Sequence, residues 1–371
     1  MKILKTKVKL SKLKWRHRIT ALFCALTLGF GAWLCTPTII SLVSNFVNKI
    51  ALSSAMFALP SGTLYVAEAY YNREDIPDDI PEITPPSSSE DASSDTPISA
   101  PVADNIPISQ RGKIEEITYL PSMSANIVTF VNGSIKNDTK HSKEKVEEIL
   151  STPHKISLDS GPQVLIMHTH TTESYEPYSR DYFDTQSTSR TTDNENNMAK
   201  VGQVLTETLR ENGIFAIHDT TQHDYPSYNG SYDRSAETVK AYLKKYPSIK
   251  IVLDIHRDAI EREDGTRIKP TTTVNGKKAA QMMIISGCDD GTMGMPNWRE
   301  NLKFSAALQN ALETKYPTLM RPILFCYRKY NQNLTTGSIL IEVGGHANTL
   351  YEAVYSAKLL GETLSDMLNK K

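Results

Sequence analysis

The sequence predicts an α/β fold in which helices flank a mainly parallel, twisted β-sheet. From about residue 111 to the C-terminus, short apolar runs alternate with amphipathic stretches of helical spacing, which is the pattern of strand–helix–strand units. Hydrophobic residues make up 39% and charged residues 22% of the 371 residues, so the chain can bury a core and is not disordered throughout. The net charge of −1 argues against a protein that coats nucleic acid.

Six apolar runs are the predicted strands of the sheet: 164–168, 214–218, 250–255, 281–286, 322–326 and 338–343. The predicted helices cover residues 142–150, 194–211, 234–246, 298–315 and 349–368. In the last of these, apolar residues recur at helical spacing from Leu350 to Leu364. Asn212-Gly213 is a typical signal for the end of helix 194–211.

The first 43 residues predict a membrane anchor. Residues 1–18 contain six Lys, two Arg and no acid, and residues 19–43 contain no charged side chain. A helix of that length reaches about 37 Å, which exceeds the roughly 30 Å core of a bilayer. The basic flank would remain cytoplasmic and the rest of the chain would lie outside. A cleaved signal peptide and a buried core helix are the alternatives.

Residues 44–110 are predicted to connect this anchor to the folded domain. A membrane-proximal segment comes first. From Glu74 to Pro107 there are nine acidic residues, seven prolines and no Lys or Arg, a composition typical of a solvated, extended linker. The predicted organisation is therefore a basic segment (1–18), an anchor (19–43), a linker region (44–110) and one extracytoplasmic domain (111–371).

Ionisable side chains gather where predicted strands end. In parallel sheets such ends meet at one edge, which is where functional groups collect. The first strand end supplies His168, His170 and Glu173, the second Asp254, His256, Arg257 and Asp258, and the third Glu342, His346 and Asn348. Glu195 stands near the start of the predicted helix 194–211.

Histidine and carboxylate groups at one edge are the ligand types of Zn²⁺, and a catalytic zinc site leaves one position for water. Each residue also has a structural interpretation. A histidine after a strand is commonly a hydrogen-bonded structural residue, and Glu195 could simply complement a helix dipole. Glu342 interrupts the apolar run ILIEVGG, where a buried carboxylate is costly unless it is paired or functional.

Other catalytic classes lack their motifs. There is no GxSxG nucleophile elbow and no phosphate-binding loop. Outside the apolar run the chain has only Cys288 and Cys326, which could form one bridge or remain two buried thiols. A metal-independent hydrolase that uses Cys288 is therefore a weaker alternative.

Three motifs, HTHTTESY, DIHRDA and IEVGGHANT, occur in this order after the predicted anchor and linker. Together they resemble the stage II sporulation protein P family of endospore-forming bacteria, over about residues 111–371. That family is similar in turn to zinc-dependent N-acetylmuramoyl-L-alanine amidases, and the resemblance implies a zinc amidase-like form of the predicted α/β fold.

The resemblance implies the roles of individual residues. His170, Glu195 and His256 fall on the zinc ligands and Glu342 on the catalytic carboxylate. The turn before His170 departs from the amidase pattern, which leaves His168 as a rival ligand, and Glu173 competes with Glu195. Arg257 and His346 are candidates for substrate binding or the oxyanion.

The implied activity is hydrolysis of the bond between N-acetylmuramic acid and L-Ala in peptidoglycan, with endopeptidase activity on peptide cross-links. The implied role is engulfment of the forespore, in the space between the mother-cell and forespore membranes. The implied partners are the stage II sporulation proteins D and M. The sequence therefore predicts a single-pass cell-membrane zinc amidase. The alternative is a non-catalytic module of the same fold that binds the cell wall or acts as a scaffold.

Overall fold

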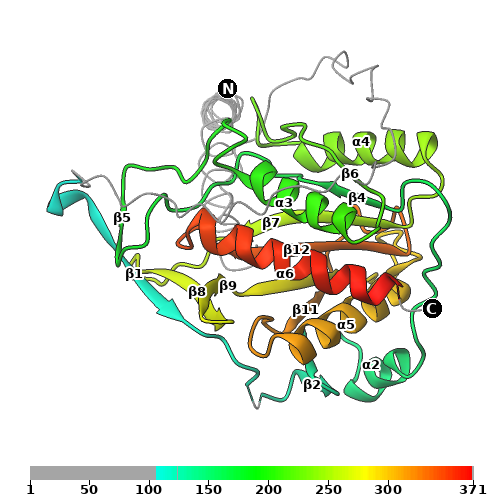
Figure 1. Ribbon diagram of the computed structural model, residues 1–371. Coiled ribbons are helices and arrows are strands. Elements are labelled where there is room, and N and C mark those ends of the chain that lie inside the picture. Colours follow the sequence, from blue (N-terminus) through cyan, green and yellow to red (C-terminus); the bar gives the residue numbers. More distant parts are fainter. Residues whose placement is uncertain (1–105, 123, 370–371) are drawn as a thin grey trace, which may run out of the picture. The chain divides into compact units, whose positions relative to one another are not determined.

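The computed structural model describes residues 106–122 and 124–369, which form a mixed α/β fold (Figure 1). The strands are β1 (Arg111–Ile117), β2 (Ile127–Phe130), β3 (Gly133–Asn137), β4 (Val164–Met167), β5 (Tyr182–Asp184), β6 (Ala216–His218), β7 (Ile251–Asp258), β8 (Arg267–Val274), β9 (Lys277–Ala280), β10 (Met282–Gly287), β11 (Ile323–Cys326) and β12 (Gly337–Gly345). The helices are α2 (Lys143–Leu150), α3 (Met198–Glu211), α4 (Ser231–Lys245), α5 (Trp298–Lys315) and α6 (Leu350–Asn369), after a short 3-10 helix at Ile108–Gln110.

The main sheet has eight strands in the order β2-β3-β11-β10-β12-β7-β4-β6. Strands β12, β7, β4 and β6 form one parallel block, and β10, β11 and β3 form another, with β2 antiparallel to β3 at the edge. An antiparallel pairing of β10 with β12 joins the two parallel blocks. Parallel strands need a crossover connection. Helix α3 supplies it between the neighbours β4 and β6, and α4 supplies it between β6 and β7, which lie on either side of β4. The predicted mainly parallel sheet is thus present within the described residues.

Helices cover both faces of this sheet. On one face α6 lies between α3 and α5 (Figure 1), and their apolar side chains share a core with Ile166 and Ile341. On the other face Val239 and Tyr242 of α4 pack against Leu165 and Val252. Side chains point alternately to the two faces along a strand. The successive apolar residues of β4 and of the first part of β7 therefore face both helix layers, and both strands are buried on both faces.

A second, four-stranded sheet has the order β5-β1-β8-β9. Strand β1 is antiparallel to β5 and parallel to β8, and β9 returns antiparallel to β8. These strands were not among the predicted ones, and neither were β2 and β3. Their sequences are short and rich in Lys, Glu and Thr, so periodicity alone does not single them out.

The predicted helices and strands otherwise agree with the structure to within a few residues. Helix α5 has the predicted bounds, 298–315. The helix predicted from residue 194 begins at Met198, because the side chain of Asn197 caps it by accepting a hydrogen bond from the Ala199 amide at 2.9 Å. Glu195 therefore precedes the helix.

The localisation prediction needs correction. None of the helices in residues 106–122 and 124–369 is long and apolar enough to cross a membrane. The segment on which the prediction of a single-pass membrane protein rested, residues 19–43, lies outside the described residues, as does most of the predicted linker. The assignment to the cell membrane is therefore not retained.

Gly202 lets α3 approach the sheet closely. A Cβ atom at this position would overlap the imidazole rings of His168 and His218. These two rings are in contact, with their Nε2 atoms 2.9 Å apart. The absence of a side chain at Gly202 thus leaves room for a buried histidine pair between helix and sheet.

We expect Gly202→Ala to lower the free energy of unfolding by about 1–3 kcal/mol, because the added methyl group would force the rings or the helix to move. Denaturant unfolding measures this change. Glu211→Ala, on the exposed end of the same helix, is the control and should stay within about 0.5 kcal/mol of the unmodified protein. A Gly202→Ala protein as stable as the unmodified one would contradict this packing.

Candidate functional site

Strand register places three ionisable side chains on one face of the main sheet. Strands β4, β7 and β12 are adjacent and parallel, and Cα pairing aligns Met167 and Leu340 with Asp254 and aligns Glu342 with His256. Partner residues of parallel strands point to the same face, and residues two apart do so as well. Asp254, His256 and Glu342 therefore lie on the face covered by α4.

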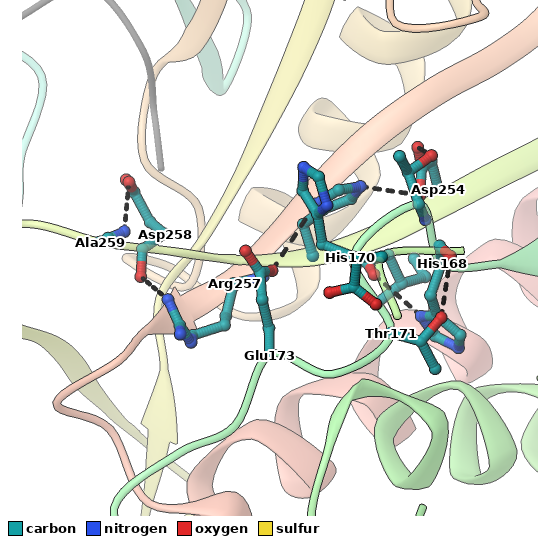
Figure 2. A network of polar contacts seen from close by, with 12 residues as sticks. His168, His170, Thr171, Glu173, Asp254, Arg257, Asp258 and Ala259 are labelled. Atoms are coloured by element: carbon teal, nitrogen blue, oxygen red, sulfur yellow. Dashed lines mark hydrogen bonds and ion pairs between the residues drawn. The ribbon is translucent and has the colours of Figure 1, made fainter. Parts of the chain in front are cut away.

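The turn after β4 brings His170 and Glu173 to the same place. The Glu173 amide donates to the His170 carbonyl at 3.2 Å, so the chain folds back over the strand ends. The His170 ring lies 5.2 Å from the His256 ring at 86°. Glu173 Oε2 lies 3.6 Å from His256 Nδ1. Figure 2 shows Glu173 between Arg257 and the pair His170 and Asp254.

These groups are almost completely buried, and burial shifts their pKa values. Desolvation lowers the pKa of His170 to about 3, so the ring is neutral at physiological pH and keeps one unprotonated nitrogen. The pKa of Glu173 is well below its usual range despite the cost of burial, because Arg257, His256 and Arg190 favour its charge. The pKa of His256 is raised against desolvation by the carboxylates of Asp254 and Glu173.

Glu342 behaves in the opposite way. Its side chain is 3% exposed, and burial, followed by the negative charge of Asp258, raises its pKa well above the usual value. Its Oε2 atom has no hydrogen-bond partner. An unpartnered oxygen in a buried carboxyl group, next to His256 in the strand register, calls for an explanation such as a bound group.

Two tyrosines from the segment after β6 cover the histidines. The Tyr228 ring stacks on His170 at 4.4 Å, and its hydroxyl lies 2.8 Å from His170 Nε2. Tyr232, in the first turn of α4, is parallel to the His256 ring at 6.5 Å. Sequence reasoning missed both residues, because the segment YPSYNGSY matches no site motif and only folding of the β6–α4 connection brings it there.

Arginine side chains neutralise the buried carboxylates. The Arg257 amide lies 3.3 Å from Glu173 Oε2, and the Arg257 guanidinium donates to the carbonyls of Ser174 and Ser189 at 2.8 Å. Arg190, which the sequence analysis also missed, lies 3.4 Å from Glu173 Oε1 and 2.8 Å from Asp224. Arg257 thus has the contacts of a buried positioning group and does not face solvent.

The structure does not bring Glu195 to this cluster. Its side chain is 70% exposed and pairs with Lys200 at 2.8 Å. The resemblance places the ligand on a Glu that opens the next helix, but the helix begins at Met198, after Glu195, and the loop before it leaves that residue exposed. Among the two carboxylates considered as the second ligand, Glu173 is the one placed beside His256.

The other two candidate histidines, His168 and His346, are buried as well. His168 Nδ1 lies 2.9 Å from the Ile255 carbonyl and its Nε2 lies 2.9 Å from His218, so the ring packs on the α3 face, away from Glu342. His346 is buried at the end of β12, where its amide donates to the Asp258 carbonyl at 2.9 Å. Its Nε2 has no hydrogen-bond partner.

The donor types at the site suit zinc: a neutral imidazole, a second imidazole and an ionised carboxylate. The buried Glu342 Oε2 atom, which has no hydrogen-bond partner, also fits a site built for an additional group. As arranged, however, no three His, Cys, Asp or Glu side chains of residues 106–122 and 124–369 converge closely enough to hold an ion.

The cysteines offer no competing nucleophile. Cys288 and Cys326 are free thiols. Burial raises the pKa of Cys288 to about 12 and that of Cys326 to about 11, so neither forms the reactive thiolate at neutral pH. Cys288 packs in the α5 and α6 core and Cys326 in an apolar cluster with Met283 and Leu340.

The chain matches known proteins over this region. A family model described as "Stage II sporulation protein P (SpoIIP)" matches residues 89–365. The stage II sporulation protein P of Bacillus subtilis (strain 168) is 29% identical over 226 residues, which cover 58% of this chain and 53% of the relative. The match thus spans about half the length of that relative.

Solved structures of similar fold include N-acetylmuramoyl-L-alanine amidases. AmiC2 of Nostoc punctiforme is 12% identical, with a TM-score of 0.32, over 57% of this chain and 98% of that one. Ami1 of Mycobacterium abscessus is 13% identical, with a TM-score of 0.34, over 57% of this chain and 100% of that one. The similarity of fold at these scores is distant.

We expect Arg257→Met to lower the free energy of unfolding by about 3–5 kcal/mol, because it leaves the buried charge of Glu173 less compensated. Thermal or denaturant unfolding measures the loss. Arg262→Met is a matched control, since Arg262 pairs with Glu115 at 2.7 Å but is 46% exposed, and should cost no more than about 1 kcal/mol. Equal losses for the two variants would show that Arg257 does not balance the buried carboxylate.

Proposed function

Because the chain belongs to the stage II sporulation protein P family, we propose that its α/β domain hydrolyses peptidoglycan during sporulation. The observation that carries the proposal is the convergence of His170, Glu173, His256 and Glu342 at adjoining strand ends, all nearly completely buried. A core has no packing reason to enclose two histidines and two carboxylates, one of them with an unpartnered oxygen. Such an arrangement is typical of a hydrolytic site.

The proposed reaction is that of a zinc-dependent N-acetylmuramoyl-L-alanine amidase. His170, Glu173 and His256 would hold the ion after their side chains close in from the arrangement described above, with Glu173 taking the place first given to Glu195. Bound zinc would supply a Lewis acid for the scissile carbonyl and would lower the pKa of water towards about 7. Arg257 and Arg190 would keep the Glu173 carboxylate ionised and in place, since both favour its charged form.

Glu342 is the proposed general base and acid. It would accept a proton from the attacking water and deliver that proton to the nitrogen of the leaving amine. Its pKa is raised by burial and the charge of Asp258, which makes the carboxylate a stronger base towards the proton of the attacking water than an exposed glutamate would be. Tyr228 and Tyr232 limit access of bulk water to the two histidines.

The proposal extends to endopeptidase activity on peptide cross-links, to forespore engulfment, and to assembly with the stage II sporulation proteins D and M. These parts rest on the family resemblance alone. The unpartnered Glu342 oxygen favours an enzyme over the alternative of a non-catalytic wall-binding or scaffold module, because a module that only binds the wall gains nothing from a desolvated carboxyl group.

We expect the purified protein to release stem peptides from isolated peptidoglycan, to stop when a chelator removes metal, and to resume when zinc is restored. Mass spectrometry of the soluble fragments identifies the bond that is cut. Fragments that persist after verified removal of metal would refute the zinc mechanism. A folded, zinc-loaded protein that releases nothing would favour the scaffold alternative.

Glu342→Gln should reduce turnover at least about 100-fold, because the amide cannot carry the proton, while folding and zinc content are preserved. Release of stem peptides measures turnover, and atomic emission measures zinc. Glu362→Gln provides a control, since Glu362 lies on helix α6 on the other face of the sheet and accepts a hydrogen bond from the Tyr316 hydroxyl at 2.9 Å. Normal turnover in Glu342→Gln would remove this residue from the mechanism.

The two candidate glutamates give opposite expectations for zinc binding. Glu173→Gln should bind zinc at least about 10-fold more weakly than the unmodified protein, because it loses the carboxylate beside His256. Glu195→Gln should bind zinc normally, since its side chain faces solvent. Competition titration with a chromophoric chelator measures both affinities, and the reverse result would restore Glu195 as the ligand.

A further inference from the structure

Asp254 is a buried carboxylate to which the proposed reaction assigns no role. It is 5% exposed and stands two residues before His256 on β7, so both side chains lie on the face that contains Glu342. Charged groups at such a depth are retained only where a partner compensates the loss of hydration. The partners of Asp254 therefore indicate what it does.

The turn after β4 fixes the Asp254 carboxylate in one orientation. The Thr169 amide donates to Oδ1 at 2.8 Å and the Thr169 hydroxyl donates to Oδ2 at 2.7 Å. That hydroxyl also contacts Ser235 Oγ of α4 at 2.8 Å. Both carboxylate oxygens are thus oriented by the turn after β4, which is the turn that carries His170 and Glu173.

The oriented carboxylate contacts one nitrogen of the His256 ring. Asp254 Oδ1 lies 2.8 Å from His256 Nε2. In this arrangement the contact is an ion pair, and the N–H group of Nε2 would have to turn onto Oδ1 before it donates a hydrogen bond. The other ring nitrogen, Nδ1, faces Glu173 Oε2 at 3.6 Å. The ring therefore lies between two carboxylates, with Tyr232 parallel to it.

We propose that Asp254 is the positioning residue for His256: it holds Nε2 towards itself and leaves Nδ1 as the nitrogen presented to Glu173 and to a metal ion. This inference rests on the proposed function, because it deepens the account of the same site. A carboxylate that accepts from the second nitrogen of a ligating histidine fixes the ring orientation and makes the other nitrogen a better ligand.

A purely structural role for Asp254 makes different predictions. Its contacts with Thr169 and Ser235 would then matter only for the stability of the turn and of α4. Loss of the carboxylate would lower the unfolding temperature, but the choice of ring nitrogen and the metal affinity of the folded protein would not change. The two roles therefore separate when binding is measured on folded protein.

The first test needs no substitution. Nitrogen-15 NMR of the full chain labelled at histidine, loaded with zinc, reports which nitrogen of His256 binds the metal and which keeps its proton. We expect Nδ1 to bind the metal and Nε2 to remain protonated. Coordination through Nε2 would overturn the proposal.

The second test compares Asp254→Ala with Asp254→Asn. Asp254→Ala should weaken zinc binding 10- to 100-fold, measured by competition with a chelator on protein shown to be folded by circular dichroism. Asp254→Asn keeps an oxygen for the Thr169 amide and for His256, so it should restore part of the loss. Asp219→Ala removes another buried carboxylate, which lies 3.8 Å from His223, and controls for the general effect of such a change.

Unchanged zinc affinity in folded Asp254→Ala, or an equal loss in Asp219→Ala, would refute the positioning role. If the unmodified protein binds no zinc at all, the metal part of the proposed function fails. The positioning role is then decided by crystal structures of the metal-free proteins. A His256 ring that turns in Asp254→Ala but not in Asp219→Ala supports it, and an unmoved ring refutes it.

Discussion

The parallel register of β4, β7 and β12 is the constraint on which the site depends. It aligns Glu342 with His256 and places the turn after β4 against Asp254. Because parallel partners point to one face of the sheet, a shift of one residue in β12 would turn Glu342 into the core beneath α6. The apolar residues that alternate with the ionisable ones, such as Ile255 and Ile341, are buried in that core and oppose such a shift.

The same register has an electrostatic cost that the surrounding residues offset. Glu173, Asp254 and Glu342 are buried close together, and like charges at such distances cannot all be ionised without compensation. Arg257 and His256 favour the charge of Glu173, and Thr169 holds Asp254 with two hydrogen bonds. Glu342 has no equivalent partner, and its pKa is raised. The environment thus favours the charged form of Glu173 and disfavours that of Glu342.

Segments far from the strand ends in sequence complete the site. Tyr228 and Tyr232 reach His170 and His256 from the β6–α4 connection, and Arg190 reaches Glu173 from the loop before α3. None of these residues belongs to a recognisable motif, because their role follows from where two loops are folded and not from their spacing to the histidines. Glu195 shows the converse: it has motif-like spacing, yet the cap at Asn197 starts the helix too late to direct it inward.

The sequence by itself determined the α/β class, the main helices and the six apolar strands, because periodicity and apolar runs are local properties that burial imposes on each element. It also identified His170, His256, Glu173 and Glu342 as residues at strand ends. Only the tertiary structure decided which carboxylate stands beside His256, which face each histidine occupies, and that β10 runs antiparallel to β12. Those choices depend on contacts between residues tens of positions apart in the sequence, and local sequence patterns contain no information about such contacts.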